Sequence, residues 1–461
     1  MIGIVVSRAD PASVHIGDHL LELDDWDRTT DDTRPDGEGG GTVHRTPGFE
    51  LRTFDDLHLD LEGVADVFAD PEFVVFASKH AGDTGPLLTA HHTGNFGPAD
   101  HGGADGELAH SCANAQARVL DALREHAPSG YDVGMEGTHH GPTDVGAPSM
   151  FVELGSGETE WDDPDGARAV ARAVLDLRGV GPYRDRQVVG FGGGHYVPRF
   201  ERVVRETDWA VGHIGVDWAL DAMGDPADDR DVLRRAFEQS GATRALVEGE
   251  RPDLVSAIEA LGYRVVTETW LRETTGVPLD LVSRVEEAIG SVDAGLRFGD
   301  RARADDTDDA RSPDDIVVTS LPAALLAEAE GIDPEAARAV VERHAVAFDT
   351  EQGGSRLAGE VAFSTPDDRC TVVESFAELL DREYETVERR DGALVARETA
   401  FDPAAARDAG VPEGPAFGRL ADGEAVTVDG RTIEPEGVHE RRERRFPLDE
   451  YNDTPRTEGE R

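Results

Sequence analysis

The chain is poor in lysine, in cysteine and in long apolar runs. Lys79 is the only lysine in 461 residues, and the other 44 basic residues are arginine. Cys112 and Cys370 lie far apart, which argues against a disulfide framework and favours reduced thiols in the cytoplasm. No apolar stretch approaches the roughly 18 to 20 residues that span a bilayer, and no signal peptide is evident. We therefore expect a cytoplasmic protein without a membrane partner.

Acidic residues dominate the charge of the chain. They outnumber basic residues by 95 to 45, which gives a formal net charge of −50. A disordered acidic chain would lose its apolar periodicity, yet apolar runs alternate here with helical patterns. The composition indicates a folded protein with a carboxylate-covered surface, as halophile proteins have, whose self-repulsion is screened by salt of molar order. The charge alone does not exclude a nucleic-acid partner.

Short apolar runs alternate with amphipathic segments over the first part of the chain. This alternation predicts an α/β protein, a three-layer sandwich around a mixed, mostly parallel sheet. Strands are predicted at 2–7, 73–78, 87–91, 131–136, 150–154, 187–191, 209–214, 243–249 and 263–269. Helices are predicted at 11–23, 107–126, 165–179, 196–206, 230–240 and 253–261.

Composition also suggests the domain boundaries. We expect a catalytic domain over residues 1–299, in which the polar, Gly-rich stretch 24–42 is an acidic surface insertion. The charged run 300–315 reads as an acidic linker. Residues 316–461 are predicted to form a smaller α+β extension, whose role the sequence does not indicate.

Histidines concentrate near the ends of the predicted strands. Ten of the sixteen lie between residues 80 and 213. Because ligands bind beyond the carboxyl ends of strands in open α/β sheets, we expect these histidines to gather at one edge of the sheet. Imidazoles together with a carboxylate are a typical ligand set for catalytic zinc. A lone histidine is more often structural, so this hypothesis depends on the whole group, namely His80, His91, His92, His139, His140, His195 and His213.

The segment EGTHHGPTDVG (136–146) is the densest part of this group. In an extended backbone, Glu136 and His140 share one face and His139 takes the other. The two histidines would then serve different ions, or one would bind metal and the other substrate. The alternative for this segment is a polar turn capped by Asp144. No HExxH or paired CxxC motif is present, so the spacing alone is only moderately specific for a metal site.

The segment GFGGGHYVPRF (190–200) is the second dense stretch. Its glycines allow close approach to a ligand or a sharp strand-to-helix turn, and His195 is expected to open a helix whose N-terminus favours an anion. Arg199 and Arg202 belong to a local arginine cluster that suits phosphate contacts, with an ion-paired helix surface as the alternative. Asn95, in HTGNFG, either donates to an oxyanion or makes a left-handed turn.

At these residues the chain resembles the archaeal and plant type of D-aminoacyl-tRNA deacylase. The matching pieces are SKHAGDTGPLLTAHHTGN, EGTHHGP, GFGGGHYVPRF and VGHI, in the order of the family, and they cover roughly residues 1 to 270. The resemblance implies a zinc-dependent hydrolase with a fold similar to phosphorylases and peptidyl-tRNA hydrolases. It also implies cleavage of the ester between a D-amino acid and the 3′ end of tRNA, with aminoacylated tRNA as partner rather than DNA.

The site residues follow from the matching motifs. We expect one or two zinc ions and a zinc-activated water, with Glu136 as general base and His140 and Lys79 in the catalytic group. At position 79 the family often has arginine, which favours a charge role over Schiff-base chemistry. Two rival hypotheses are a zinc exopeptidase or amidohydrolase and a non-catalytic tRNA-binding protein, and the chain could be a monomer or a homodimer. The expected metal ligands are His80, His91, His139 and His195, and the expected substrate contacts are Asn95, His213, Arg199 and Arg202.

Overall fold

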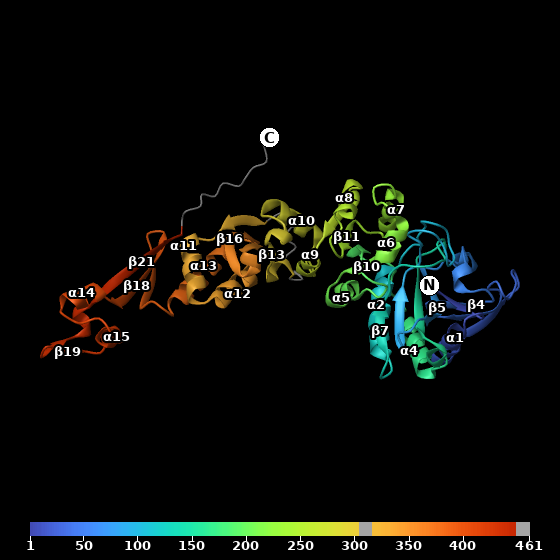
Figure 1. Ribbon diagram of the computed structural model, residues 1–461, viewed down its shortest axis with the longest axis horizontal. Coiled ribbons are helices and arrows are strands. Elements are labelled where there is room, and N and C mark those ends of the chain that lie inside the picture. Colours follow the sequence, from blue (N-terminus) through green and yellow to red (C-terminus); the bar gives the residue numbers. More distant parts are fainter. Residues whose placement is uncertain (304–315, 449–461) are drawn as a thin grey trace. The chain divides into compact units, whose positions relative to one another are not determined.

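The computed structural model describes residues 1–303 and 316–448. The chain divides into two compact units, Met1–Thr275 and Gly276–Arg461, drawn from blue to green and from yellow to red in Figure 1. This division falls before the linker expected at 300–315, most of which lies outside the described residues. Strand β13 (Arg297–Phe298) explains the difference, because it pairs with β15 (Ala347–Glu351) and so belongs to a sheet of the second unit.

The first unit is built on an eight-stranded mixed sheet, in the order β2-β3-β4-β1-β5-β8-β6-β7. Four of its pairings are parallel, β1 with β4, β1 with β5, β5 with β8 and β6 with β7, and three are antiparallel. The α/β class with a mostly parallel sheet is therefore confirmed. The strands are β1 (Ile2–Ser7), β2 (Asp27–Asp31), β3 (Gly41–Thr46), β4 (Phe49–Phe54), β5 (Phe73–Ala81), β6 (Leu87–His91), β7 (Asp132–Met135) and β8 (Ser149–Ser156).

The expected surface insertion 24–42 contributes a strand of this sheet. Its segment DRTTD forms β2, which is mostly exposed and pairs antiparallel with β3. An exposed edge strand needs no apolar alternation, so the polar sequence did not predict it. The insertion is therefore partly an extension of the sheet.

Helices and loops cover the two faces of the sheet differently. Helices α1 (Pro11–Leu23), α2 (Ala113–His126), α3 (Glu158–Trp161) and α4 (Pro164–Leu175) contact one another and the strands. On the face that bears Val74 and Phe76, the short 3₁₀ helix Val64–Val67 and loop residues such as Val145 complete an apolar cluster. That face also bears the histidines described below.

The remaining predicted strands of the first unit form a separate parallel sheet, in the order β10-β9-β11-β12. Strand β9 lies inside this sheet with β10 on one side and β11 on the other, so the strand order reverses there. The elements are β9 (Gln187–Phe191), α5 (Pro198–Glu206), β10 (Ala210–Gly215), α6 (Asp217–Met223), α7 (Arg230–Ser240), β11 (Arg244–Val247), α8 (Pro252–Ala260), β12 (Arg264–Val266) and α9 (Glu268–Glu273).

The second unit is α+β, as its sequence predicts. It holds a four-stranded sheet β13-β15-β16-β14, a three-stranded sheet β17-β18-β21 and a hairpin of β19 and β20. Its other elements are α10 (Leu279–Ala288), β14 (Val317–Ser320), α11 (Ala323–Ile332), α12 (Pro334–His344), β16 (Arg356–Phe363), α13 (Pro366–Leu380), β17 (Thr386–Arg390), β18 (Ala393–Phe401), α14 (Pro403–Asp408), α15 (Pro415–Ala421), β19 (Val426–Val428), β20 (Arg431–Ile433) and β21 (His439–Pro447). Within the described residues, we find no helix with the length and apolarity needed to cross a bilayer.

Candidate active site

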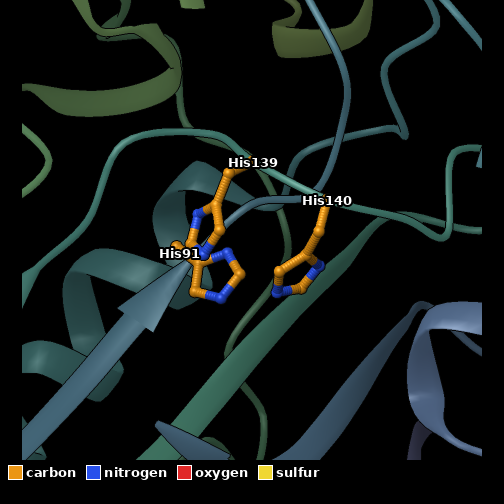
Figure 2. Close-up of side chains that lie close together, drawn as sticks. All are labelled: His91, His139 and His140. Carbon is orange, nitrogen blue, oxygen red and sulfur yellow. The ribbon is translucent and has the colours of Figure 1, made fainter. Parts of the chain in front are cut away.

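Histidines and carboxylates meet in one cluster of the first unit. Its ligand atoms form three overlapping groups, and in each group they lie within 4.8 Å of one another. The groups are His91, His139 and His140; Glu136, His139 and His195; and His80, Glu136 and Glu153. Figure 2 shows the first group, in which three imidazole rings converge from the end of β6 and from the loop after β7. The structure therefore brings together most of the side chains that the sequence singled out.

Backbone carbonyl groups fix the orientation of each of the three rings in Figure 2. Nδ1 of His91 donates to the carbonyl of His92 at 3.1 Å, that of His139 to Gly137 at 2.9 Å, and that of His140 to Gly141 at 2.7 Å. A carbonyl only accepts, so each ring carries its proton on Nδ1 and has its lone pair on Nε2 when neutral. Such backbone contacts are the usual means of orienting histidine ligands of a metal.

Burial keeps two of these rings neutral. It lowers the pKa of His139 to about 3 and that of His140 well below its usual value. Burial lowers the pKa of His91 as well, but the nearby charges of Glu153 and Glu136 together outweigh it and raise the pKa. Neutral imidazole is the form that binds a metal ion.

Two buried carboxylates lie beside the rings. Oε2 of Glu136 lies 2.7 Å from Nε2 of His195, and Oε1 lies 3.2 Å from Nδ1 of His80. Glu153 Oε2 lies 3.4 Å from the same His80 nitrogen, and its Oε1 lies 3.6 Å from Nε2 of His91. Although burial opposes ionisation, these histidines hold the pKa of both carboxyl groups below the usual range. Both glutamates are therefore ionised.

The sequence did not predict Glu153. It lies in the middle of β8, in an otherwise apolar run that reads as a buried strand. The available signal was a charged residue at a position where both sheet faces are covered, since such a charge needs a partner. Here Ser78 donates to Glu153 at 2.8 Å, in addition to the two histidines.

His80 has a different environment from the three rings of Figure 2. Its Nδ1 faces the two carboxylates, and its Nε2 lies 2.9 Å from the hydroxyl of Tyr196. Burial alone would lower its pKa, but the negative carboxylates of Glu136 and Glu153 beside Nδ1 outweigh it and raise the pKa to about 11. Both nitrogens of His80 thus have partners within the protein.

The cluster lies on a face of the sheet and not along one edge. In the strand register, His80 lies opposite Gly155, and His91 lies opposite Phe151. The carboxyl ends of β5 and β6 lie at opposite ends of the sheet, because β5 runs parallel to β8 and β6 runs antiparallel to it. Glu153, midway between them on β8, bridges both histidines. The expectation of a common carboxyl edge is therefore wrong for His80 and His91.

His195 enters the cluster from the second sheet through the loop 192–197. Gly192 and Gly193 have φ of 95° and 87°, and a Cβ on Gly192 would lie 2.5 Å from the carbonyl oxygen of Glu248. The amide of Gly137 donates to the carbonyl of His195 at 2.9 Å, which joins this loop to the first sheet. Helix α5 begins only at Pro198, so His195 precedes the helix instead of opening it.

Lys79 lies apart from the cluster. Successive residues of a strand point to opposite faces, so Lys79 points away from the face that bears His80. Its ammonium group lies 5.1 Å from the ring centroid of Trp161. The structure gives Lys79 a cation–π partner and not a position beside the imidazoles.

The four expected substrate contacts have partners within the protein. Asn95 donates to the carbonyl of Gly102 at 2.9 Å, which closes its own loop. His213 is fully buried and lies 2.7 Å from the carbonyl oxygen of Ala109. Arg199 and Arg202 both pair with Glu268, at 3.3 and 2.8 Å. The arginines thus form the ion-paired helix surface that the sequence left open as an alternative.

The chain is similar over most of its length to proteins of one family. The family model for D-aminoacyl-tRNA deacylase matches residues 67–266. A D-aminoacyl-tRNA deacylase of Halorubrum lacusprofundi is 54% identical over 98% of both chains, and one of Natronomonas pharaonis is 54% identical over 97% of this chain and 100% of its own. A crystal structure of a conserved protein of unknown function, 26% identical, covers 60% of this chain and 98% of its own with a TM-score of 0.54. The chain therefore belongs to the D-aminoacyl-tRNA deacylase family, as its motifs predicted.

Proposed function

We propose that this protein hydrolyses the ester bond of D-aminoacyl-tRNA and releases the D-amino acid and tRNA. Relatives that match nearly the whole chain carry the name of this activity. The observation that supports the chemistry is the convergence of three backbone-oriented imidazoles beside two buried carboxylates.

The donor set of the cluster fits a zinc ion. Three buried atoms, Nε2 of His91 and both oxygens of Glu136, form no hydrogen bond of acceptable geometry with any described residue. Charged neighbours are nevertheless close to them. Buried polar atoms of this kind cost free energy unless they are paired or coordinate a metal. We propose His91, His139 and His140 as zinc ligands through Nε2. This assigns His140 to the metal and His80 to the carboxylates, the reverse of the roles that the sequence suggested.

A zinc ion held by these imidazoles would supply Lewis-acid chemistry, with a more acidic water and a polarised ester carbonyl. Glu136 accepts the proton of the attacking water, because it is ionised and its Oε2 lies 3.9 Å from Nε2 of His139. His80 lies between Glu136 and Glu153, offsets their mutual repulsion and keeps both in place. His195, which is one-third exposed, forms the side of the cluster open to substrate.

The test of this function is hydrolysis of matched D- and L-aminoacyl-tRNA in molar salt, with and without a chelator. We expect turnover of the D-ester that the chelator abolishes and that added zinc restores. Equal rates on both enantiomers would contradict the proofreading role, and full activity in metal-free protein would contradict the zinc mechanism. A panel of peptides in the same assay separates an ester hydrolase from a peptidase.

A further inference from the structure

A crevice lies at the carboxyl end of the second sheet, lined by segments that follow β10 and β11. In this parallel sheet β9 is flanked by β10 and β11, so the strand order reverses at β9. Ligands of open α/β sheets bind at such reversals, outside the carboxyl ends of the strands. Loop 192–197 follows β9, α6 follows β10, and the segment 248–251 follows β11, so all three segments lie at this end.

Hydrogen bonds connect these segments to one another and to the cluster. The amide of Asp217, the first residue of α6, donates to the carbonyl of Gly193 at 2.9 Å. Arg251 reaches across from the segment after β11 to Asp217, with an Nη2–Oδ1 distance of 2.7 Å. Because Gly193 is two residues before His195, the start of α6 is close to the cluster along the chain and in space.

The crevice itself lies between α6 and the start of α8. Its volume is about 450 Å³, within the roughly 300 to 1,000 Å³ of small-molecule sites. Apolar side chains line much of it, and carboxylates of Asp221, Glu250 and Asp253 stand among them. The apolar part is formed by Leu220, Met223, Pro226, Pro252 and Leu254.

An exposed tryptophan lies on α6, the helix that forms one side of this crevice. Trp218 is 50% exposed, whereas the other four tryptophans are buried or half-buried in the part of the chain that the structure describes. Trp218 and Asp221 are three residues apart on α6, so they share one side of the helix, and Asp221 lines the crevice. The exposed ring of Trp218 offers a flat apolar face on which a nucleic-acid base can stack.

We propose that this crevice binds the unpaired nucleotides at the 3′ end of the tRNA, with one base stacked on Trp218. The inference rests on the proposed function, which brings that single-stranded end to the neighbouring cluster. Unpaired bases of RNA are recognised by stacking on aromatic rings and by hydrogen bonds to their edges. The carboxylates of the crevice accept hydrogen bonds from the amino groups of cytosine and adenine.

The negative charge of the crevice favours the binding of bases over the binding of phosphate groups. Three carboxylates, those of Asp221, Glu250 and Asp253, line it, and the guanidinium of Arg251 already pairs with Asp217. A binding mode built on phosphate contacts loses affinity steeply as salt rises, whereas stacking on an apolar ring does not depend on charge. Stacking therefore suits a protein of net charge −50 that works in concentrated salt.

The test is titration of the full-length protein in molar salt with the trinucleotide CCA that carries no amino acid, with tryptophan fluorescence as the signal. We expect saturable quenching in the wild type. In Trp218→Ala the affinity for CCA should fall about 5- to 100-fold, and Trp218→Phe should recover part of it. Because both variants lack the reporting tryptophan, their affinities are measured by competition. Tyr183→Ala is the matched control, because Tyr183 is a 45% exposed aromatic residue that precedes β9 and so lies at the opposite end of the sheet.

Kinetics supply a second readout. Trp218→Ala should raise KM for D-aminoacyl-tRNA with little change in kcat, and should leave hydrolysis of a simple D-amino acid methyl ester unchanged. Undiminished CCA binding in Trp218→Ala would overturn the inference, as would an equal loss on the methyl ester. Because CCA binding requires no turnover, a protein that binds CCA through Trp218 but does not deacylate tRNA would contradict the proposed function alone.

Discussion

Oε2 of Glu136 lies 2.7 Å from Nε2 of His195, and this contact joins the two sheets of the first unit. Glu136 follows β7 of the eight-stranded sheet, and His195 follows β9 of the parallel sheet. The amide of Gly137 donates to the carbonyl of His195 at 2.9 Å, so the backbones meet at the same point. Neither sheet alone contains the complete cluster, and the chemistry therefore depends on their packing.

Replacement of Glu136 by glutamine should lower kcat for D-aminoacyl-tRNA by a factor on the order of 10² to 10³, because the amide cannot accept the proton of the attacking water. Zinc content should stay at the wild-type level if the imidazoles are the ligands. Glu201→Gln, which changes a carboxylate paired with Arg124 on the surface, is the control and should retain activity. A Glu136→Gln enzyme with the wild-type rate would remove Glu136 from the mechanism.

His91→Ala should lose stoichiometric zinc, since it removes one of three proposed ligands. In the wild type, a chelator should lower the midpoint of thermal unfolding, because an ion that binds only the folded state stabilises it. The variant should show little or no such shift. The measurements are metal analysis and unfolding monitored by circular dichroism.

The control for that experiment is His126→Ala, which removes an imidazole paired with Asp176 at the surface, 2.9 Å away. It should retain zinc and the response to the chelator. Retention of zinc by folded His91→Ala at the wild-type level would contradict the assignment of His91 as a ligand.

Lys79→Met should reduce stability by about 0.5 to 1 kcal/mol, through loss of the cation–π contact with Trp161, and leave kcat/KM for tRNA unchanged. Lys79→Arg should retain both, since a guanidinium makes the same contact. Chemical denaturation and kinetics on the same preparations separate the two effects. A tenfold fall in kcat/KM for Lys79→Met would return this residue to the catalytic group.

The sequence predicted the members of the cluster better than its geometry. Motif and composition identified Glu136 and the histidines, because these residue types are rare in the interior unless they bind something. The antiparallel pairing of β6 with β8 depends on long-range register, which no local pattern contains. Glu268, the partner of Arg199, is equally remote in sequence, so the sequence could not decide between a phosphate contact and an ion pair for that arginine.

The stability of the first unit should fall as pH drops from about 6.5 towards 4, in part through His58. This ring is buried against Phe76 and Phe151, and burial lowers its pKa to about 4. Between these pH values the unfolded chain binds the proton and the folded chain does not, so protonation favours unfolding. The loss should approach roughly 3 kcal/mol for this group at pH 4 and be absent above about pH 7.

The comparison of wild type with His58→Gln isolates this contribution, because other buried histidines also titrate. Both proteins should be unfolded with guanidinium chloride at several pH values and at constant ionic strength. The wild type should show a steeper loss of unfolding free energy on acidification than the variant. Parallel pH profiles would show that His58 is not kept neutral by the fold.

Gly192→Ala should destabilise the protein and impair catalysis together. Gly192 has φ of 95°, and a Cβ there would lie 2.5 Å from the carbonyl oxygen of Glu248, so the loop must move and carry His195 with it. We expect a loss of about 1 to 3 kcal/mol in unfolding free energy and a fall in kcat, because strained backbone and displaced catalytic groups share one cause. Gly194→Ala is the matched control for stability, since its nearest neighbour would be 4.0 Å from the new Cβ. Equal stability of the two variants would show that the left-handed conformation at Gly192 does not hold this loop in place.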